Sequence, residues 1–195
     1  MTKLVVDITM SIDGFIAGPD ISIEDPMGKG GTTLHNWFFK DKTDIDADIL
    51  AQLVESIGAV ILGNRMYSTA IDIPWGGVTP FSSPAIVVCH KEPGKKVPGF
   101  SYNTSGIESA LEHARNLAGD KNIWVIGGAN IIQQFLKAGL VDILNLHIAP
   151  ILLHRGTRLF DGIESPIIQF TKKSVVETPA AVHLKYVVSR SINST

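Results

Sequence analysis

Alternating apolar and polar positions begin near the amino terminus and predict a first strand there. From Leu4 to Met10 every even position is apolar, whereas Asp7 and Thr9 stand at odd positions. A period of two is typical of a half-buried strand. Further apolar runs with strand character follow at residues 59–62, 84–89, 100–102, 123–126 and 141–150, the last continuing through 151–153 beyond Pro150. Short runs of this kind indicate buried strands.

The segments between these runs have apolar residues at helical spacing. Residues 44–56 predict a helix with Asp44 or Asp46 as its N-cap. Residues 106–119 predict a second helix, and the segment that starts at residue 129 predicts a third, which ends near Gly139. A short helix is expected to leave the strand at 59–62.

The tail of the chain changes character. Residues 167–176 and 182–189 have strand propensity, and 177–180 provide a turn between them, so we expect an antiparallel hairpin. Strands that alternate with helices, followed by a terminal hairpin, predict a single α/β domain over residues 1–195. The expected architecture is a three-layer α/β/α sandwich with a mixed central sheet.

Composition and charge exclude several classes of function. Seventeen basic and nineteen acidic residues give a net charge of -2, which offers no electrostatic basis for binding nucleic acid or an anionic membrane. No apolar run approaches the roughly 20 residues that span a bilayer, and the amino terminus lacks a signal-peptide core. The single cysteine, Cys89, excludes an internal disulfide and suits a reducing compartment. We therefore expect a cytoplasmic protein.

The most informative motif lies where the run at 123–126 meets the following helix. Gly127 and Gly128 occupy this junction, and without Cβ atoms they let a ligand approach the backbone closely. The first N–H groups of a helix lack partners within it and lie at the positive end of its dipole. The junction therefore predicts a binding site for an anion such as a phosphate or pyrophosphate, although a tight strand-to-helix connection alone has the same sequence.

Two further observations concern the loops and the histidines. Residues 11–34 form a long connection rich in Gly and Pro, and loops of such length are often functional, so this segment is a candidate lid. The six histidines include no close pair at the spacing of metal ligands, so we expect no metal site.

Three further segments occur with the Gly-Gly junction and carry a family resemblance. They are Ser-Ile-Asp-Gly-Phe-Ile-Ala-Gly at 11–18, Leu-Gly-Asn-Arg-Met-Tyr at 62–67, and Leu-Val-Asp-Ile-Leu-Asn-Leu-His-Ile-Ala-Pro-Ile-Leu-Leu at 140–153, the last followed by Arg-Gly-Thr-Arg-Leu-Phe at 155–160. Together with Val-Ile-Gly-Gly-Ala at 125–129, the set resembles the dihydrofolate reductase superfamily. It is more closely similar to the RibD C-terminal family, the reductase domain of bacterial riboflavin biosynthesis. The resemblance extends from residue 3 to about residue 189.

This resemblance implies a dihydrofolate reductase-like fold with NADPH as the hydride donor. The cofactor would lie across the carboxyl ends of the central strands, where open α/β sheets bind their ligands. By position, the pyrophosphate would contact Ile126, Gly127, Gly128, Ala129 and Asn130, and the adenosine phosphate would contact Gly63, Asn64, Arg65 and Met66. The adenine side would be Cys89, His90 and Lys91, and the nicotinamide would border Thr9, Ile16 and Ala17.

One departure from the family pattern concerns the choice of cofactor. The family often has Gly-Arg-x-Thr-Tyr where this chain has Gly-Asn-Arg-Met-Tyr at 63–67. Arg65, His90 or Lys91 would then have to supply the charge that holds a 2′-phosphate. NADPH is the expected cofactor, and NADH stays possible.

A second departure concerns the substrate. Dihydrofolate reductases resemble this chain in placing an aromatic pair, here Trp37 and Phe38, on the first helix, and they place a carboxylate about one turn earlier. The corresponding residues 32–35 contain no acid, which argues against dihydrofolate as the natural substrate.

Polar residues of the first strand and its exit, Asp7, Ser11 and Asp13, are the candidate catalytic residues. A lone carboxylate among apolar neighbours is costly to desolvate. Asp7 therefore either faces a pocket, as a substrate anchor or proton relay, or is satisfied by backbone N–H groups or at the sheet surface. Asp13 precedes Gly14 in a turn, where aspartate is also common for structural reasons.

The candidate substrate-binding residues are Asp7, Trp37, Arg155 and Arg158. Trp37 could stack on a flat heterocycle, although an aromatic residue at helical spacing is more often part of the core. Arg155 and Arg158 could hold a substrate phosphate, and they are equally well explained as solvated residues of a basic turn.

These observations lead to a main functional hypothesis with two alternatives. The resemblance implies an NADPH-dependent reductase of a small heterocycle, with 5-amino-6-(5-phosphoribosylamino)uracil as the expected substrate. The alternatives are a dihydrofolate reductase and a non-catalytic nucleotide-binding or regulatory protein on the same scaffold. The strand at 144–153 and the terminal hairpin further suggest a homodimer that forms through sheet edges.

Overall fold

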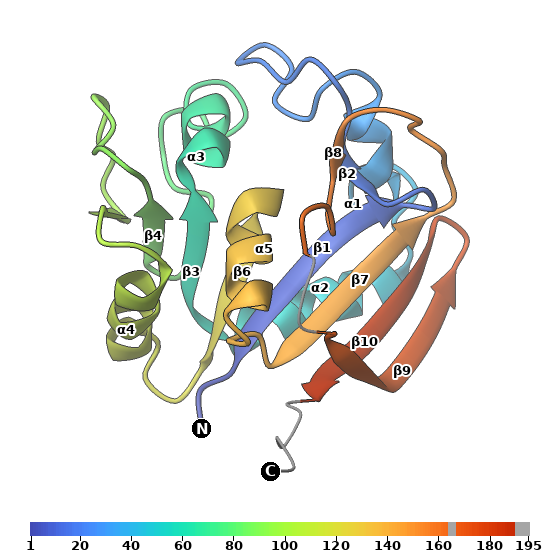
Figure 1. The fold of residues 1–195 in the computed structure, drawn as a ribbon. Coiled ribbons are helices and arrows are strands. Elements are labelled where there is room, and N and C mark those ends of the chain that lie inside the picture. The colour runs from blue at the N-terminus through green and yellow to red at the C-terminus, as the bar shows by residue number, and fades with distance from the viewer. Residues whose placement is uncertain (164–166, 190–195) are drawn as a thin grey trace.

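A mixed β-sheet forms the centre of the molecule (Figure 1). The structure is a computed structural model that describes residues 1–163 and 167–189. Within these ranges eight strands follow the order β5-β4-β3-β6-β1-β7-β10-β9. Their bounds are β1 Leu4–Ser11, β3 Ile57–Gly63, β4 Ala85–Val88, β5 Phe100–Asn103, β6 Asn122–Gly127, β7 Ile143–Ala149, β9 Gln169–Thr178 and β10 Ala181–Ser189. All pairings from β5 to β7 are parallel, and the β9–β10 hairpin is antiparallel to β7 and within itself.

Helices cover both faces of this sheet, which confirms the predicted three-layer α/β/α architecture. Figure 1 shows α4 and α5 in front of the sheet and α2 behind it. The helices are η1 Gly31–His35, α1 Asn36–Phe39, α2 Asp44–Ser56, α3 Asn64–Ala70, α4 Ile107–Ala118 and α5 Ala129–Lys137. None of the helices in the described ranges is long and apolar enough to cross a bilayer.

The alternation along β1 distributes its side chains between two hydrophobic clusters. Leu4 and Val6 pack into the cluster that contains α4 and α5, whereas Val5 packs into the cluster on the side of α2 and α3. Because successive side chains of a strand point to opposite faces, Asp7 and Thr9 lie on the same face as Val5. The polar positions of the first strand therefore all point toward α2.

The start of α2 differs from the prediction in the identity of its cap. Thr43, rather than Asp44 or Asp46, is the N-cap, and Asp46 occupies the N3 position of a capping box. The side chain of Thr43 accepts from the backbone N–H of Asp46, and the Asp46 carboxylate accepts from the backbone N–H of Thr43. A threonine one residue upstream leaves Asp46 free to take up this reciprocal role.

The long connection after β1 is more ordered than expected. It contains a short strand, β2 (Phe15–Ala17), which pairs antiparallel with β8 (Thr157–Arg158). Residues 151–153 do not continue the preceding strand, because the chain turns after Pro150 and the N–H of Ile151 donates to the carbonyl of Ala149. The turn directs the chain toward β8, and the pairing of β8 with β2 holds β2 in place.

The position of β7 corrects the predicted mode of dimer formation. β7 lies between β1 and β10, so its backbone is already paired on both sides. The strand at the edge of this side of the sheet is β9. An assembly through the edge of residues 144–153 is therefore wrong, and the homodimer itself stays a prediction.

Gly156 allows β2 and β8 to approach closely, and this contact yields a first prediction. Its φ is +137°, and a Cβ at this position would lie 2.0 Å from the carbonyl oxygen of Ala17. We expect Gly156→Ala to lower the free energy of unfolding by about 2 kcal/mol or more, since backbone must move in both segments. Chemical denaturation measures the change.

Gly94→Ala is the matched control, because a Cβ at Gly94 meets nothing within 4 Å. It should change the stability by less than about 0.5 kcal/mol. Equal stability of the two variants would contradict the close approach at Gly156.

Candidate functional site

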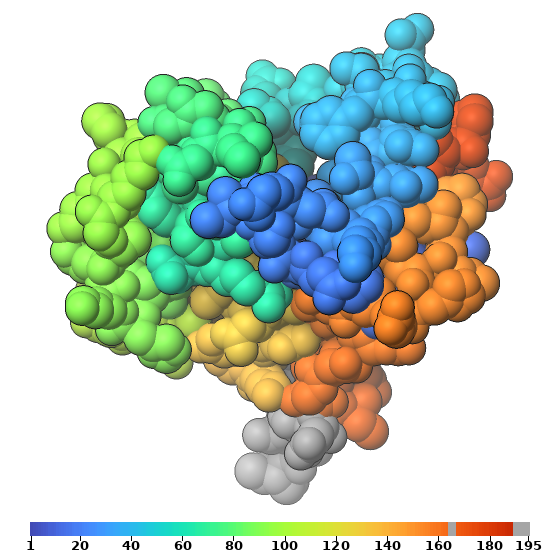
Figure 2. All heavy atoms as spheres, turned by 90° about the horizontal axis from the view of Figure 1, so that it is seen from above, coloured from blue at the N-terminus to red at the C-terminus, as the bar shows by residue number. Residues whose placement is uncertain are grey.

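A cavity of about 930 Å³ lies on the α2 side of the sheet and reaches the carboxyl ends of the central strands. β1 contributes Asp7 and Thr9 to its wall, α3 contributes Arg65, and the β6–α5 junction contributes Gly127 and Gly128. Figure 2 views this end of the molecule from above, where the segment that follows β1, in blue, lies between the green segment after β3 and the orange segment after β7. The predicted location at the carboxyl ends of the strands therefore coincides with a real cavity.

The cavity brings together about half of the residues that the sequence suggested. Those that line it are Asp7, Thr9, Ile16, Ala17, Trp37, Arg65, Met66, Ile126, Gly127, Gly128 and Ala129. Those that do not are Ser11, Asp13, Gly63, Asn64, Cys89, His90, Lys91, Asn130, Arg155 and Arg158.

The Gly-Gly junction presents bare backbone to the cavity. A Cβ on Gly128 would meet only the guanidinium of Arg65, at 3.9 Å, and a Cβ on Gly127 only the sulfur of Met66, at 3.7 Å. No side chain caps the amino terminus of α5. Unencumbered N–H groups at a helix start, with a guanidinium beside them, suit a phosphate or pyrophosphate.

Gly63 serves the packing of this junction. A Cβ at Gly63 would lie 2.9 Å from the side chain of Ile131 in α5. Its absence lets α5 pack against the end of β3. Asn64 and Arg65 then begin α3 directly after Gly63, and this brings Arg65 to the glycine turn.

Asp7 forms a buried polar pair in the wall of the cavity. Its Oδ1 lies 2.9 Å from Nε2 of His147, and its Oδ2 accepts a 2.9 Å hydrogen bond from the side-chain amide of Asn145. The residues come from adjacent strands, since Asp7 is in register with Asn145 and Thr9 with His147. Asp7 therefore faces the cavity, as one of the two alternatives predicted. Side chains, rather than backbone N–H groups, form the hydrogen bonds with its carboxylate.

The hydrogen bonds continue from His147 away from the cavity. Its Nδ1 lies 2.7 Å from Nδ1 of His183, which stands directly opposite it on β10. Nε2 of His183 lies 2.9 Å from Oδ1 of Asp46, the N3 residue of α2. The other carboxylate oxygen of Asp46 accepts from the hydroxyl and the backbone N–H of Thr43.

The ionisation of this buried chain follows from its contacts. Burial raises the pKa of Asp46, but hydrogen bonds from Thr43, Thr178 and His183 outweigh it and lower the pKa below its usual value. Burial lowers the pKa of His183, and the neighbouring His147 lowers it further, against the opposing effect of Asp46 and Asp7. Asp46 is therefore a carboxylate in this environment, and His183 favours its neutral form.

Trp37 separates the histidine pair from part of the cavity. Its ring centroid lies 4.5 Å from that of His147 and 5.0 Å from that of His183, and its indole N–H donates to the hydroxyl of Thr9. Trp37 is buried and lines the cavity, so it is part of the core, and its stacking on a heterocycle stays a prediction. His35 also lines the cavity, and burial followed by the charge of His147 lowers its pKa from 6.5 to about 4.

Ser11 and Asp13 form a latch outside the cavity. Ser11 is fully buried and donates to Oδ1 of Asp13, which also accepts from the backbone N–H of Leu153, while Oδ2 accepts from that of His154. These bonds tie the β1–β2 turn to the segment after β7. The latch holds in place β2, whose residues Ile16 and Ala17 line the cavity.

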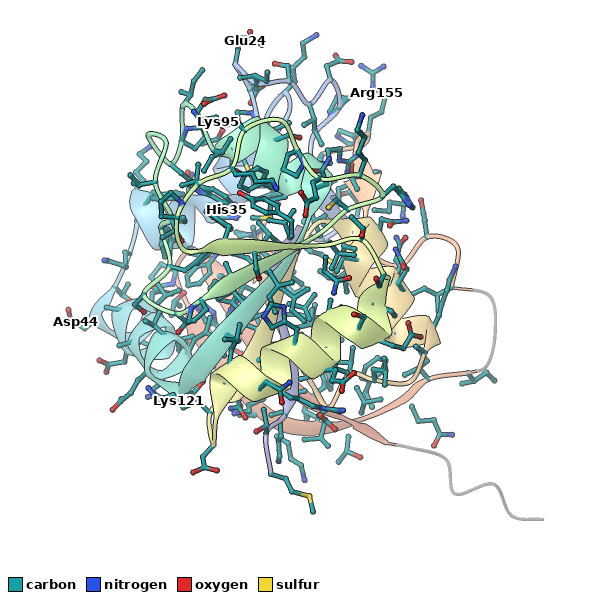
Figure 3. The ribbon with its side chains drawn as sticks, turned by 90° about the vertical axis from the view of Figure 1, so that its left-hand side faces the viewer. Glu24, His35, Asp44, Lys95, Lys121 and Arg155 are labelled. Carbon is teal, nitrogen blue, oxygen red and sulfur yellow. The ribbon has the colours of Figure 1, made fainter. Side chains whose placement is uncertain are left out.

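The remaining candidates lie apart from the cavity. Cys89 is buried with its thiol toward the carbonyl of Asn103, and burial raises its pKa. His90 and Lys91 are exposed. Arg158 lies over the ring of Phe15 at 4.4 Å, and Figure 3 shows Arg155 at the outer rim, pointing away from the molecule.

Sequence reasoning missed His147, His183, Asp46 and Asn145. Asn145 and His147 share the face of β7 that the register pairs with Asp7 and Thr9, so polar residues at odd positions of two buried strands were a usable indication. No sequence spacing could pair His147 with His183, because the hairpin brings them together. In the described ranges no three His, Cys, Asp or Glu residues form a group that could hold a metal ion.

The latch at Asp13 yields a prediction on acid stability. Burial opposes ionisation, but the hydrogen bonds from Ser11, His154 and Leu153 outweigh it and lower the pKa of Asp13 from 3.8 to about 2. Because the folded-state pKa lies below the unfolded one, the stabilisation is complete above pH 3.8 and is lost as the pH falls through 2. Asp13→Asn should therefore be less stable than the parent at neutral pH, with a difference that shrinks in this acid window.

Chemical denaturation at a series of pH values tests this. Asp120→Asn, which removes an exposed carboxylate, is the control and should change the stability by less than about 0.5 kcal/mol. A difference between Asp13→Asn and the parent that does not vary with pH would refute the assignment.

Several known proteins are similar to this chain in sequence or in structure. The family model described as the RibD C-terminal domain matches residues 2–184. The chain is similar to a pyrimidine reductase-like protein of Corynebacterium diphtheriae, with a TM-score of 0.62 and 18% identity over 97% of this chain and 93% of that one.

Two further solved structures share the fold. A diaminohydroxyphosphoribosylaminopyrimidine deaminase/5-amino-6-(5-phosphoribosylamino)uracil reductase of Thermotoga maritima has a TM-score of 0.63 and 16% identity, over 95% of this chain and 56% of that one. Dihydrofolate reductase of Enterococcus faecalis, complexed with NADP(H), has a TM-score of 0.61 and 14% identity, over 96% of this chain and 97% of that one. The predicted dihydrofolate reductase-like fold is confirmed.

Proposed function

Since the chain belongs to the RibD C-terminal domain family, we propose that it is an NADPH-dependent reductase of a small heterocyclic substrate. The substrate class is the ribosylaminopyrimidine phosphates, represented by 5-amino-6-(5-phosphoribosylamino)uracil. One observation carries the proposal: a single cavity is lined both by a bare glycine turn and by a buried carboxylate–imidazole pair. The first suits a dinucleotide, and the second suits proton transfer.

The residues around the Gly127–Gly128 turn fit a nicotinamide dinucleotide. Gly127, Gly128 and the first turn of α5 would hold the pyrophosphate through backbone N–H groups, and Arg65 would add a positive charge. Ile16, Ala17 and Thr9 would border the nicotinamide. When bound, the cofactor supplies a hydride, so the protein has to position both molecules, exclude water and handle one proton.

The groups that would transfer the proton are buried. Asp7 and His147 are both nearly fully buried and line the cavity. Trp37 packs over the imidazole and offers part of an apolar wall for a flat ring. Asp7 is therefore the residue that we propose as substrate anchor and proton donor, whereas Ser11 and Asp13 hold the β1–β2 turn in place.

Reduction of a panel of substrates tests the proposal. With NADPH and 5-amino-6-(5-phosphoribosylamino)uracil, we expect the absorbance of the reduced cofactor to fall, and with dihydrofolate we expect little or no change. Methotrexate should not inhibit, because residues 32–35 offer no carboxylate for a pterin ring. Absence of turnover with every pyrimidine, pterin and carbonyl compound, together with no thermal stabilisation by NADPH, would refute the proposal.

The glycine turn provides a direct binding test. Gly128→Asp places a carboxylate where the pyrophosphate would lie, so NADPH affinity should fall by about tenfold or more. Gly128→Ala, whose Cβ makes only an ordinary 3.9 Å contact with Arg65, separates the effect of the added carbon from that of the charge, and it should weaken binding less than Gly128→Asp. Fluorescence titration measures both variants. Unchanged affinity in a folded Gly128→Asp protein would place the phosphate elsewhere.

A further inference from the structure

The chain of hydrogen bonds from Asp7 to Asp46 has a definite number of protons. Three contacts link Asp7, His147, His183 and Asp46 in sequence. An ionised carboxylate only accepts hydrogen bonds, and each contact needs one proton on a ring nitrogen. Two neutral imidazoles carry two such protons together. A complete chain therefore holds one proton more, carried either by one of the two rings or by a carboxyl group.

The contacts of Asp46 and His183 leave His147 or Asp7 as the carrier of that proton. Asp46 is held ionised by the capping box, so Nε2 of His183 donates to it. A neutral His183 then has only a lone pair at Nδ1, and this atom accepts from Nδ1 of His147. With Asp7 as an ionised carboxylate, His147 donates at both nitrogens, to His183 and to Asp7, and is the imidazolium.

The surroundings of His147 suit a positive charge. The titratable groups packed around it are Asp7 on β1, His183 on β10 and His35 on η1, while Asp46 on α2 acts through His183. The indole of Trp37 lies against its ring at 4.5 Å, and an aromatic face attracts a cation. His35 stays neutral beside it, since its pKa is lowered to about 4.

We propose that His183 and Asp46 hold His147 as an imidazolium and that this imidazolium stores the proton consumed in the reduction, releasing it through Asp7. Asp7 and His147 face the cavity, so Asp7 is the catalytic residue, and His183 and Asp46 are positioning residues that act through His147. The inference rests on the proposed function and deepens it.

The step is balanced in atoms and electrons. Hydride from a reduced nicotinamide forms a C–H bond at the carbon of a substrate C=N or C=O group, and the π electrons move to the nitrogen or oxygen. Nε2 of His147 passes its proton to Asp7, and Asp7 passes a proton to that atom. The nicotinamide is oxidised, the substrate is reduced, and His147 becomes neutral. After the product leaves, solvent returns one proton to His147 through Asp7.

The proton count can be measured on the unliganded protein. Ring-nitrogen NMR of a sample labelled with ¹⁵N-histidine should show both nitrogens of His147 protonated at neutral pH and only one nitrogen of His183 protonated. Two neutral rings at neutral pH would overturn the proposal. This measurement needs neither cofactor nor turnover.

The role in turnover is tested with His183→Phe, which keeps a ring but removes the acceptor for Nδ1 of His147. His147 should then become neutral at the same pH, kcat should fall about tenfold or more with little change in KM, and the alkaline fall in kcat should move to lower pH. Lys185→Gln, on the same strand but exposed, is the matched control. It should leave the protonation of His147, kcat and the pH profile unchanged.

A folded His183→Phe protein with the parent's kcat and pH profile would overturn the proposal. If His183→Phe does not fold, the ring spectrum of the parent protein still decides. A parent spectrum with an imidazolium at His147 but no turnover on any substrate would refute the proposed function and leave the proton assignment intact.

Discussion

The carboxylate of Asp46 joins the start of α2 to the polar face of the sheet, and the buried site depends on this contact. One of its oxygens completes the capping box with Thr43, and the other accepts from His183. A buried carboxylate needs such partners, because an unpaired charge in the interior is costly. The same contact sets the tautomer of His183 and, through it, the protonation of His147. Helix geometry and site chemistry are thus coupled through one residue.

The cavity wall combines bare backbone with buried titratable groups, and the fold explains why they lie close together. Parallel strands bring their carboxyl ends to one edge, so the Gly127–Gly128 turn after β6 lies beside the ends of β3 and β1. The odd positions of β1 and β7 point to the α2 side and supply Asp7 and His147. A ligand in this cavity therefore contacts both backbone N–H groups of the glycine turn and the buried titratable groups of the sheet face.

Much of the fold followed from local patterns. The helix that starts at residue 129 was predictable because its apolar residues recur at helical spacing, and the structure buries them. The strand that ends at the glycine pair followed from a short apolar run. The N-cap of α2 was misplaced because Thr43, Asp44 and Asp46 all favour helix starts, and reciprocal hydrogen bonds decided among them. Residues 151–153 looked like a strand because they are apolar, but the turn at Pro150 takes them out of the sheet.

By itself the chain determined the layer order, the glycine turn and the presence of a carboxylate among apolar neighbours in β1, because these depend on periodicity and on residues adjacent in sequence. Only the tertiary structure decided what satisfies that carboxylate. His147 and His183 stand 36 residues apart and meet through the register of β7 and β10, and Asp46 reaches them from a helix on the covering layer. Pairing across strands depends on sheet order and register, which no local spacing records.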